Sequence, residues 1–523
     1  MKKIRIFNAI FAISLVFSAV LTGCSSSSVS NEEKKETAET TPKEGGILTI
    51  ARLADAENLD PQFMSTINAA SVTQHKIYEG LVQRDKNSEI KPMLATEWKQ
   101  VDDLTWEFNL RQGVTFHDGT PFTAEAVKKT FDRILDKEVA SPRANLFEKV
   151  KEIKIINEHT VQFILTEPFS PLLSILSNHE GSIFSPKAIE KYGKQLSQHP
   201  VGTGPFTFQT WTPGQEIILV KNEAYWGEKP KVDKVVFKVI PEDATRIAMV
   251  ETGEAHIAEP VPVTEVERVQ SSSVMSLYRS EAFGTEFIGF NTKKKPFDDV
   301  RVRQAISHAI ETDAIIKGVF NGVGTKSNST MGPKVLGYNP DLKGYEYDIN
   351  KAKALLSEAG YPNGFKTTIL TNDLKERMNL AEVVQSQLKG IGIDVEVKVL
   401  EFGTFFATAA KGETDLFITS WRNATGDGDY NQYNQFHSKS QGSAGNYFFY
   451  KNPEVDKLIE EGRKEKDLSQ REKIYAQIQE IEMKETPFVP IRNLENIAAV
   501  SKNVKGVWMS PSGYLMINEV TIQ

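Results

Sequence analysis

Strands and helices alternate regularly between residues 348 and 419, and this alternation limits the possible folds more than any other feature of the sequence. The predicted elements are a helix at 348–360, a strand at 365–370, a helix at 377–388, a strand at 394–400, a short helix ending at 412 and a buried strand at 416–419. Such alternation predicts a mostly parallel sheet with helices on both faces. Ligands of parallel sheets bind beyond the carboxyl ends of the strands, so the loop after Thr419 is a candidate binding site.

Other segments add antiparallel structure. Thr105–Leu110 and Thr160–Leu165 alternate polar and apolar side chains and are expected to pair as antiparallel strands of one sheet. Residues 231–240 alternate in the same way, and a helix follows that we expect Asp243 to cap and Gly253 to end. The fold class is therefore α/β, and a chain of 523 residues predicts two or three domains.

The amino-terminal segment has the pattern of a secretory signal. Three basic residues occur in the first five positions, and the run 9–21 is apolar except for two serines. This run of about 13 residues is too short to span a bilayer, which takes about 20. It ends in Leu-Thr-Gly-Cys, which resembles the bacterial lipobox and implies cleavage of residues 1–23 and a lipid on Cys24. Cys24 is the only cysteine, so no internal disulfide can form; the alternative is an ordinary signal peptide with a chance cysteine.

Residues 24–46 contain a serine run followed by Glu, Lys and Thr, without apolar periodicity. Such a segment cannot bury enough apolar surface to offset the entropy lost on ordering, so it is predicted to be a flexible tether. The chain has a net charge of −7, and removal of the basic signal makes the remainder more negative. An acidic chain of this kind is not expected to bind nucleic acid.

A series of short blocks occurs in a fixed order through the chain. The blocks are Asn58–Pro61, Ile77–Leu81, Leu94–Trp98, Trp106–Phe108, Leu110–Ala124, Val201–Phe206, Phe290–Thr292 and Pro296–Ala305. Together they resemble the extracellular solute-binding proteins of family 5, the peptide and nickel receptors of ABC importers. The resemblance implies a bilobed periplasmic-binding-protein-like clamp (type II, cluster C) with a subdomain inserted in the first lobe. Its two lobes would close around a ligand about a hinge.

The resemblance also implies a division of the chain. The predicted segments are a first lobe of 47–71, 200–283 and 492–523, an inserted subdomain of 72–199, and a second lobe of 284–491, with the hinge near Phe283 and Asn493. The protein would be a monomeric binding subunit, not an enzyme, and would need no cofactor. It would be held on the outer face of the cell membrane by its lipid, and would deliver a small peptide to permease and ATPase subunits. A lipid-held receptor suits a Gram-positive surface.

The loop after the strand at 416–419 has the composition of a small-ligand site. It combines one aromatic platform with several polar groups. The candidate ligand-binding residues here are Trp421, Arg422, Asn423, Thr425, Asp427 and Asp429. The alternative is a surface turn in which the two aspartates are turn or cap residues. Tyr78 and Thr203, from the family blocks, are further candidates for lining the cleft.

Two departures from the family pattern narrow the predicted ligand. Dipeptide receptors of this family place an aspartate three residues after the tryptophan and an arginine farther upstream, and these positions are Ala424 and Thr371 here. Residues 421–429 are instead similar to the glutathione-binding branch, with Thr-Gly-acid-x-Asp after small polar residues. Glutathione would then place a carboxylate on Arg422 and its ammonium on Asp427 or Asp429, with Arg143 as a second cation.

Three other functions stay open. A nickel or metallophore receptor would use imidazole ligands, but no two of the eight histidines lie within five residues of each other, and only His437 follows the candidate loop. An exported hydrolase is disfavoured, because His179-Glu180 lacks the second histidine of a zinc protease and no Gly-x-Ser-x-Gly motif occurs. A receptor that senses a peptide without importing it cannot be distinguished by sequence.

Overall fold

The computed structural model describes residues 45–442 and 445–523, so the signal sequence, Cys24 and most of the predicted tether lie outside the described residues. The last two residues of that tether already belong to the folded body. The Gly45 N–H donates to the Lys231 carbonyl at 2.6 Å, and the Gly46 N–H donates to Asp233 Oδ2 at 2.9 Å. Among the described residues, no helix combines the length and the apolar character needed to cross a bilayer.

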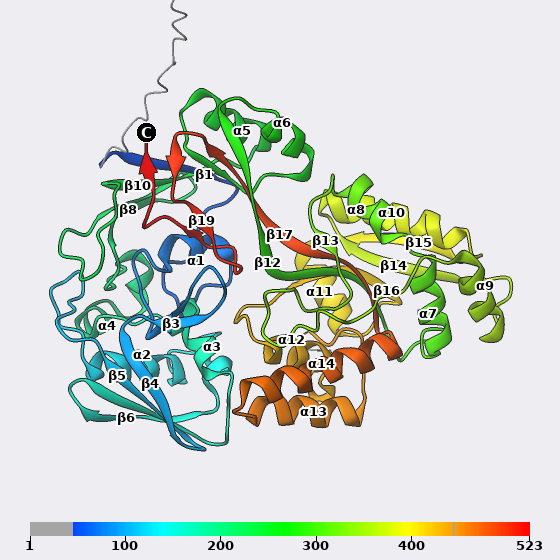
Figure 1. Cartoon of the computed structure of the whole chain (residues 1–523), viewed down its shortest axis with the longest axis horizontal. Coiled ribbons are helices and arrows are strands. Elements are labelled where there is room, and N and C mark those ends of the chain that lie inside the picture. The colour runs from blue at the N-terminus through cyan, green and yellow to red at the C-terminus, as the bar shows by residue number, and fades with distance from the viewer. Residues whose placement is uncertain (1–44, 443–444) are drawn as a thin grey trace, which may run out of the picture. The chain divides into compact units, whose positions relative to one another are not determined.

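One eleven-stranded sheet runs through the described part of the chain (Figure 1). In spatial order its strands are β15 (Asp394–Leu400), β14 (Lys366–Asn372), β16 (Leu416–Arg422), β12 (Met275–Phe290), β17 (Phe488–Ser501), β11 (Ile257–Glu259), β1 (Ile47–Arg52), β10 (Lys234–Val239), β9 (Glu216–Lys221) and β8 (Phe206–Thr212), and β13 (Thr325–Lys326) pairs with β17. The two long antiparallel strands β12 and β17 join the halves of this sheet (Figure 1).

The ladder between β12 and β17 is interrupted where the hinge is predicted. Its register shifts between Glu281 and Thr285, and pairing resumes with Thr285 opposite Asn493. On one side of the interruption Met275 packs in an apolar cluster of the first lobe, and on the other side Ile288 packs in a cluster of the second lobe. The same two strands therefore contribute to both hydrophobic cores. The domain boundaries themselves stay a prediction.

The second lobe contains the predicted strand–helix alternation. β14 pairs in parallel with both β15 and β16. Helix α9 (Ile349–Glu358) precedes β14, α10 (Lys375–Lys389) connects β14 to β15, and α11 (Phe402–Ala410) connects β15 to β16. Asp348 caps α9, as predicted, by accepting the Lys351 N–H at 2.9 Å. The predicted parallel pairing of this segment is therefore found, and β1 also pairs in parallel with β10 and β11. Because β12 joins β16 in antiparallel register, and β17 joins β12 likewise, the complete sheet is mixed.

The inserted subdomain has its own four-stranded antiparallel sheet, in the order β4 (Ala95–Asp102), β5 (Thr105–Leu110), β7 (Thr160–Leu165) and β6 (Val150–Asn157). The predicted pairing of β5 with β7 is confirmed. Phe108, Phe131 and Phe163 form the centre of its core, with Phe163 5.3 Å from the first ring and 4.9 Å from the second. Aromatic edge-to-face packing of this kind gives the subdomain a stable core of its own.

One predicted cap is displaced by a residue. Helix α5 (Asp243–Thr252) is capped by Glu242, whose carboxylate accepts the N–H groups of Ala244 and Thr245, and Gly253 ends the helix with a φ of 81°.

The remaining helices and strands complete the two lobes and the inserted subdomain. They are α1 (Ile67–Thr73), α2 (Ala124–Leu135), α3 (Leu172–Leu176), α4 (Pro186–Tyr192), α6 (Val266–Gln270), α7 (Val300–Ala309), α8 (Thr312–Val319), α12 (Gly428–Phe436), α13 (Pro453–Lys464), α14 (Leu468–Glu485), β2 (Val82–Arg84), β3 (Ile90–Pro92), β18 (Val504–Lys505), β19 (Trp508–Met509), β20 (Leu515–Met516) and β21 (Thr521–Ile522).

Candidate ligand-binding site

Strand β16 is longer than predicted, and this changes the position of two candidate residues. It continues to Arg422 because its pairing with β12 extends to Gly284 opposite Arg422. Trp421 and Arg422 are therefore strand residues whose side chains point to opposite faces of the sheet. The Trp421 ring lies 5.5 Å from that of Tyr430 on α12, and its indole nitrogen is buried without a hydrogen-bond partner among the described residues.

A tight turn joins β16 to α12, and Asn423 holds it. The Asn423 side-chain oxygen accepts the N–H groups of Thr425 at 2.9 Å and of Gly426 at 2.7 Å. Its amide nitrogen donates to the Asp427 carbonyl at 2.6 Å. Gly426 has a φ of 71°, which favours glycine at this position. The buried amide of Asn423 is thus fully used in shaping the turn.

Asp427 caps α12. This cap is the structural alternative that the sequence allows for the two aspartates of the loop. Its carboxylate accepts the Asp429 N–H at 3.0 Å and forms an ion pair with Arg471 of α14, with nitrogen–oxygen distances of 2.7 and 3.0 Å. The Ser174 hydroxyl of α3 donates to the same carboxylate at 3.0 Å. Burial alone would raise the pKa of Asp427, but the ion pair with Arg471 holds it below its usual range. Because all these contacts are internal, Asp427 is not available to a ligand.

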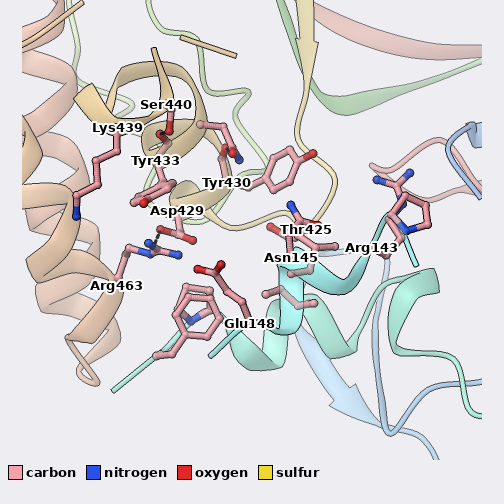
Figure 2. Close-up of a pocket in the computed structure, with 16 residues that line it drawn as sticks. Arg143, Asn145, Glu148, Thr425, Asp429, Tyr430, Tyr433, Lys439, Ser440 and Arg463 are labelled. Carbon is pink, nitrogen blue, oxygen red and sulfur yellow. Dashed lines mark hydrogen bonds and ion pairs between the residues drawn. The ribbon is translucent and has the colours of Figure 1, made fainter. Parts of the chain in front are cut away.

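A cavity of about 360 Å³ opens beside this turn, between the inserted subdomain and the second lobe (Figure 2). Its volume is within the range of small-ligand sites. It is lined by Pro142, Arg143, Asn145, Leu146, Glu148, Phe169, Pro171, Ile175, Thr425, Asp429, Tyr430, Tyr433, Asn434, Lys439, Ser440 and Arg463. Cations, acids and aromatic rings thus face one space from both parts of the chain.

An ion pair between Asp429 and Arg463 forms one side of the cavity (Figure 2). Arg463 Nε lies 3.0 Å from Asp429 Oδ1, but that oxygen is buried and accepts no hydrogen bond from the described residues. Burial raises the pKa of Asp429 to about 6, although Arg463 acts in the opposite direction. The Arg463 guanidinium also lies over the Tyr433 ring at 4.0 Å and over the Phe169 ring at 5.3 Å. Two rings from different parts of the chain therefore position this cation.

Arg143 lies on the opposite side of the cavity from Arg463 (Figure 2). Its Nε donates to the Met64 carbonyl at 2.8 Å and lies 3.8 Å from Glu180 Oε1. The cavity thus has a guanidinium at each side and the buried carboxylate of Asp429 next to one of them. A molecule with two carboxylates and one ammonium matches this distribution of charge.

The structure brings only some of the predicted residues together. Arg143, Thr425 and Asp429 line the cavity, whereas Arg422 lines a different one. Tyr78 and Thr203 line neither: they belong to the interior, because Tyr78 packs 5.0 Å from the Phe184 ring and Thr203 donates to the buried carboxylate of Glu79 at 2.7 Å.

The sequence did not indicate four important lining residues, namely Phe169, Tyr430, Tyr433 and Arg463. Tyr430 and Tyr433 lie on the helix that follows the predicted loop. Tyr433 is four residues after Asp429, so helical spacing could have suggested it, whereas that spacing does not indicate Tyr430. No local signal marks Phe169 or Arg463, which reach the cavity from distant segments.

His437 has protein partners. Its ring stacks on Tyr433 at 4.7 Å, and its Nε2 lies 3.3 Å from Glu460 Oε1. In residues 45–442 and 445–523, no group of three or more His, Cys, Asp or Glu side chains is arranged to hold a metal ion.

Residues 89–443 match the sequence model of the bacterial extracellular solute-binding proteins, family 5, middle region. The chain belongs to this family. It is 32% identical over 485 residues to the glutathione-binding protein GsiB of Escherichia coli O1:K1 / APEC, a match that covers 91% of this chain and 94% of GsiB. The order of the family blocks is thus explained by common ancestry, and the similarity to the glutathione-binding branch is confirmed.

Solved structures of family 5 proteins have the same fold. The periplasmic binding protein DppA from Helicobacter pylori, in complex with the peptide STSA, is 34% identical with a TM-score of 0.77, and the match covers 92% of this chain and 98% of DppA. HbpA2 from Haemophilus parasuis is 28% identical with a TM-score of 0.84, covering 91% of this chain and all of HbpA2. The predicted bilobed α/β clamp is therefore confirmed.

Proposed function

We propose that this protein is the substrate-binding subunit of an ABC importer, that it captures a short peptide, and that glutathione is its specific ligand. One observation carries the proposal: a cavity between two parts of the chain presents Arg143 and Arg463 on opposite sides, with the buried carboxylate of Asp429 beside one of them. The relationship to GsiB supports the choice of glutathione, and the peptide complex of DppA supports the ligand class. The protein acts by binding and not by catalysis.

Each charged group of glutathione has a partner in this arrangement. Asp429, whose Oδ1 accepts no hydrogen bond from the residues that the structure describes, takes the ammonium group. Arg143 and Arg463 take one carboxylate each, and the Tyr430 and Tyr433 rings pack against the rest of the tripeptide. This assignment replaces the sequence-based pairing of the carboxylate with Arg422, and it leaves Asp427 as a structural residue.

We propose that closure of the lobes encloses the ligand, with the domain boundaries predicted from the sequence. Contacts between the inserted subdomain and the second lobe surround the cavity. Arg84 Nη2 donates to the Thr425 carbonyl at 2.8 Å, and the Ser170 N–H donates to the Arg463 carbonyl at 2.8 Å. A ligand that bridges the lobes adds to these contacts and favours the closed arrangement.

Calorimetry of the mature protein tests the ligand. Glutathione is expected to bind at least about tenfold more tightly than Ala-Ala, because a dipeptide has one carboxylate and leaves one guanidinium without the 1.5–3 kcal/mol of a charge-assisted hydrogen bond. γ-Glutamylcysteine keeps two carboxylates and one ammonium but places its second carboxylate one residue nearer to the ammonium, so it is expected to reach both arginines less well and to bind with intermediate affinity. Tight binding of Ala-Ala without heat from glutathione would exclude the proposed specificity.

We also propose that a lipid on Cys24 holds the protein at the outer face of the cell membrane, on a Gram-positive surface. Cys24→Ser removes the thiol that would carry the lipid, so we expect the variant in the medium and the wild-type protein in the membrane fraction. Quantitative immunoblotting of both fractions measures this, with Ser25→Ala as the matched control. Equal membrane retention of a Cys24→Ser variant from which residues 1–23 have been removed would rule out the lipid anchor.

A further inference from the structure

A groove of about 690 Å³ lies apart from the cavity beside Asp429. Its walls come from residues 83–86 and Met93 around the β2–β3 hairpin, from the loop 225–228 after β9, and from the carboxyl-terminal segment 506–519. Every lining residue lies outside residues 284–491, the predicted second lobe, so the groove is complete without that lobe. It shares no lining residue with the cavity beside Asp429. The proposed binding of glutathione therefore leaves this groove without a role.

Three aromatic side chains line the groove, namely Tyr225, Trp226 and Trp508. The rings of the first two lie 5.3 Å apart, with their planes inclined by 51°. Their polar atoms are directed into the protein, because the Tyr225 hydroxyl and the Trp226 indole N–H donate to the buried carboxylate of Glu79 at 2.7 and 2.9 Å. Both rings are therefore fixed in position, and they offer the groove aromatic surface instead of hydrogen-bonding groups.

Trp508 reaches the groove from the carboxyl-terminal segment. It lies on β19, pairs with Met516 of β20, and packs half-buried against the hydrophobic cluster around β1 and β10. Met516 and Met93 are buried and also line the groove. Methionine side chains are polarisable and adaptable, so they pack well against the methyl groups of a ligand.

The Trp226 ring already interacts with a cation of the protein itself. The Arg111 guanidinium lies 4.5 Å from the ring centre, and its Nε donates to the Met93 carbonyl at 3.1 Å. Arg111 does not line the groove. In residues 45–442 and 445–523, no lysine or arginine lies over the ring of Tyr225 or Trp508. These two rings are thus free to attract a cation from outside, since the face of an aromatic ring carries partial negative charge.

The rim of the groove is acidic, because Asp85, Glu228 and Glu519 all line it. Asp85 and Glu228 each have a lysine nitrogen 3.8 Å away. Glu519 is exposed, and its carboxylate has no ion pair or hydrogen bond within the part of the chain that the structure describes. An incoming cation therefore finds one free carboxylate beside the aromatic rings.

Two cations line the groove, but neither is placed to satisfy these rings. The terminal nitrogens of Arg84 donate to the carbonyls of Ser88 and Thr425, at 2.8 Å each, and neither carbonyl belongs to the groove. Lys86 is exposed, and its ammonium group keeps its hydration at the end of a flexible side chain. The charge of the groove is thus complementary to a cationic ligand.

We propose that this groove binds a quaternary ammonium group, with the cation against the Trp508 and Tyr225 rings and its charge balanced by Glu519. A quaternary ammonium has no N–H bonds to donate, so aromatic faces and methionines are sufficient for it, whereas a buried primary ammonium would lack acceptors. A volume of about 690 Å³ is within the range of about 300–1,000 Å³ for small-ligand sites and leaves room for the rest of the molecule.

Titration of the mature protein with choline chloride at constant ionic strength tests this proposal. Saturation-transfer NMR of the N-methyl protons measures binding, and 3,3-dimethyl-1-butanol, in which carbon replaces the charged nitrogen, is the matched neutral analogue. We expect choline to bind about tenfold more tightly than this analogue, the share that the attraction between cation and ring contributes. Trp508→Leu is expected to weaken choline binding about tenfold, whereas Trp508→Phe keeps a ring and is expected to lose less than about threefold.

Glu519→Gln is expected to weaken choline binding about threefold, and Glu480→Gln, an exposed glutamate of α14, is its control and should bind normally. Because Glu519 is exposed, this variant keeps the test decisive if Trp508→Leu fails to fold. Equal affinity for choline and the neutral analogue, or unchanged choline affinity in Trp508→Leu or Glu519→Gln, would overturn the proposal.

Competition with glutathione separates this groove from the proposed peptide site. Excess glutathione is expected to leave the choline signal unchanged, because the two cavities share no lining residue. Loss of the choline signal would place choline in the cavity beside Asp429 and reject a separate site. Choline binding by a protein that does not bind glutathione would reject only the proposed function and leave this site intact.

Discussion

Replacing Asp427 by alanine is expected to lower the free energy of unfolding by about 3–5 kcal/mol, the usual effect of removing one partner of a buried ion pair. The variant leaves the Arg471 guanidinium buried beside the Tyr475 hydroxyl without its carboxylate, and it removes the cap of α12. It also removes the acceptor of Ser174, which comes from the inserted subdomain. Guanidinium-induced unfolding followed by tryptophan fluorescence measures the change.

Asp467→Ala is the matched control for this variant. Asp467 caps α14, the helix that carries Arg471, but it is exposed and has no ion pair in the described part of the chain, so its loss is expected to cost about 1 kcal/mol. Arg471→Met in the Asp427→Ala background is expected to recover part of the lost stability, because it removes the unpaired charge. Equal effects of Asp427→Ala and Asp467→Ala would show that the ion pair contributes nothing to folding.

The sequence predicts those parts of the fold that local patterns determine. β15 occurs at Asp394–Leu400, where alternating valines predict it, and Asp348 caps α9 because its carboxylate lies next to the free N–H groups of the first turn. The end of β16 could not be found in this way. Its last residues are held as a strand by β12, which lies far away in the sequence, so no local pattern near Arg422 records that pairing.

The residues of the candidate site also divide into those that a local sequence pattern indicates and those that depend on contacts with distant segments. The turn after β16 was predicted from its position at the carboxyl edge of a sheet, and Thr425 and Asp429 do line a cavity. Sequence alone could not show which of Asp427 and Asp429 is a structural residue and which faces the cavity. The difference depends on Arg471, which forms a direct ion pair with Asp427 and not with Asp429. The sequence does not mark Arg463 as a site residue, for a related reason. It lies in the last turn of α13, where a basic residue is common because it interacts favourably with the helix dipole.

Glutathione affinity is expected to rise with pH through about 6 and then to level off, and Asp429→Asn is expected to weaken binding about 100-fold at pH 7.5. The second effect follows because the ligand ammonium would be buried without its carboxylate, a loss of about 2–5 kcal/mol. The first follows because burial raises the pKa of Asp429 to about 6 in the free protein, whereas the ammonium binds only the ionised form. Below that pH, ligand binding must displace a proton from Asp429.

The same pKa fixes the sign of the effect on folding. A carboxyl group whose folded pKa lies above its unfolded value of about 3.9 stabilises the folded protein at low pH, and this contribution is lost as the pH rises through about 6. The free energy of unfolding of the wild-type protein should therefore fall, relative to that of Asp429→Asn, between pH 4 and pH 7.

Calorimetry between pH 5 and pH 7.5 measures the binding effect, since the carboxyl, amino and thiol groups of a peptide ionise largely outside the pH 5–7 range in which the rise occurs. Glu461→Gln, on the exposed side of α13, is the control and should keep the wild-type pH profile. Affinity that depends on pH in the same way in Asp429→Asn would assign the titration to another group. Among the described residues, no other buried carboxylate lines this cavity and could replace Asp429 as the partner of the ammonium group. Normal glutathione affinity of Asp429→Asn at pH 7.5 would therefore show that Asp429 does not bind the ligand.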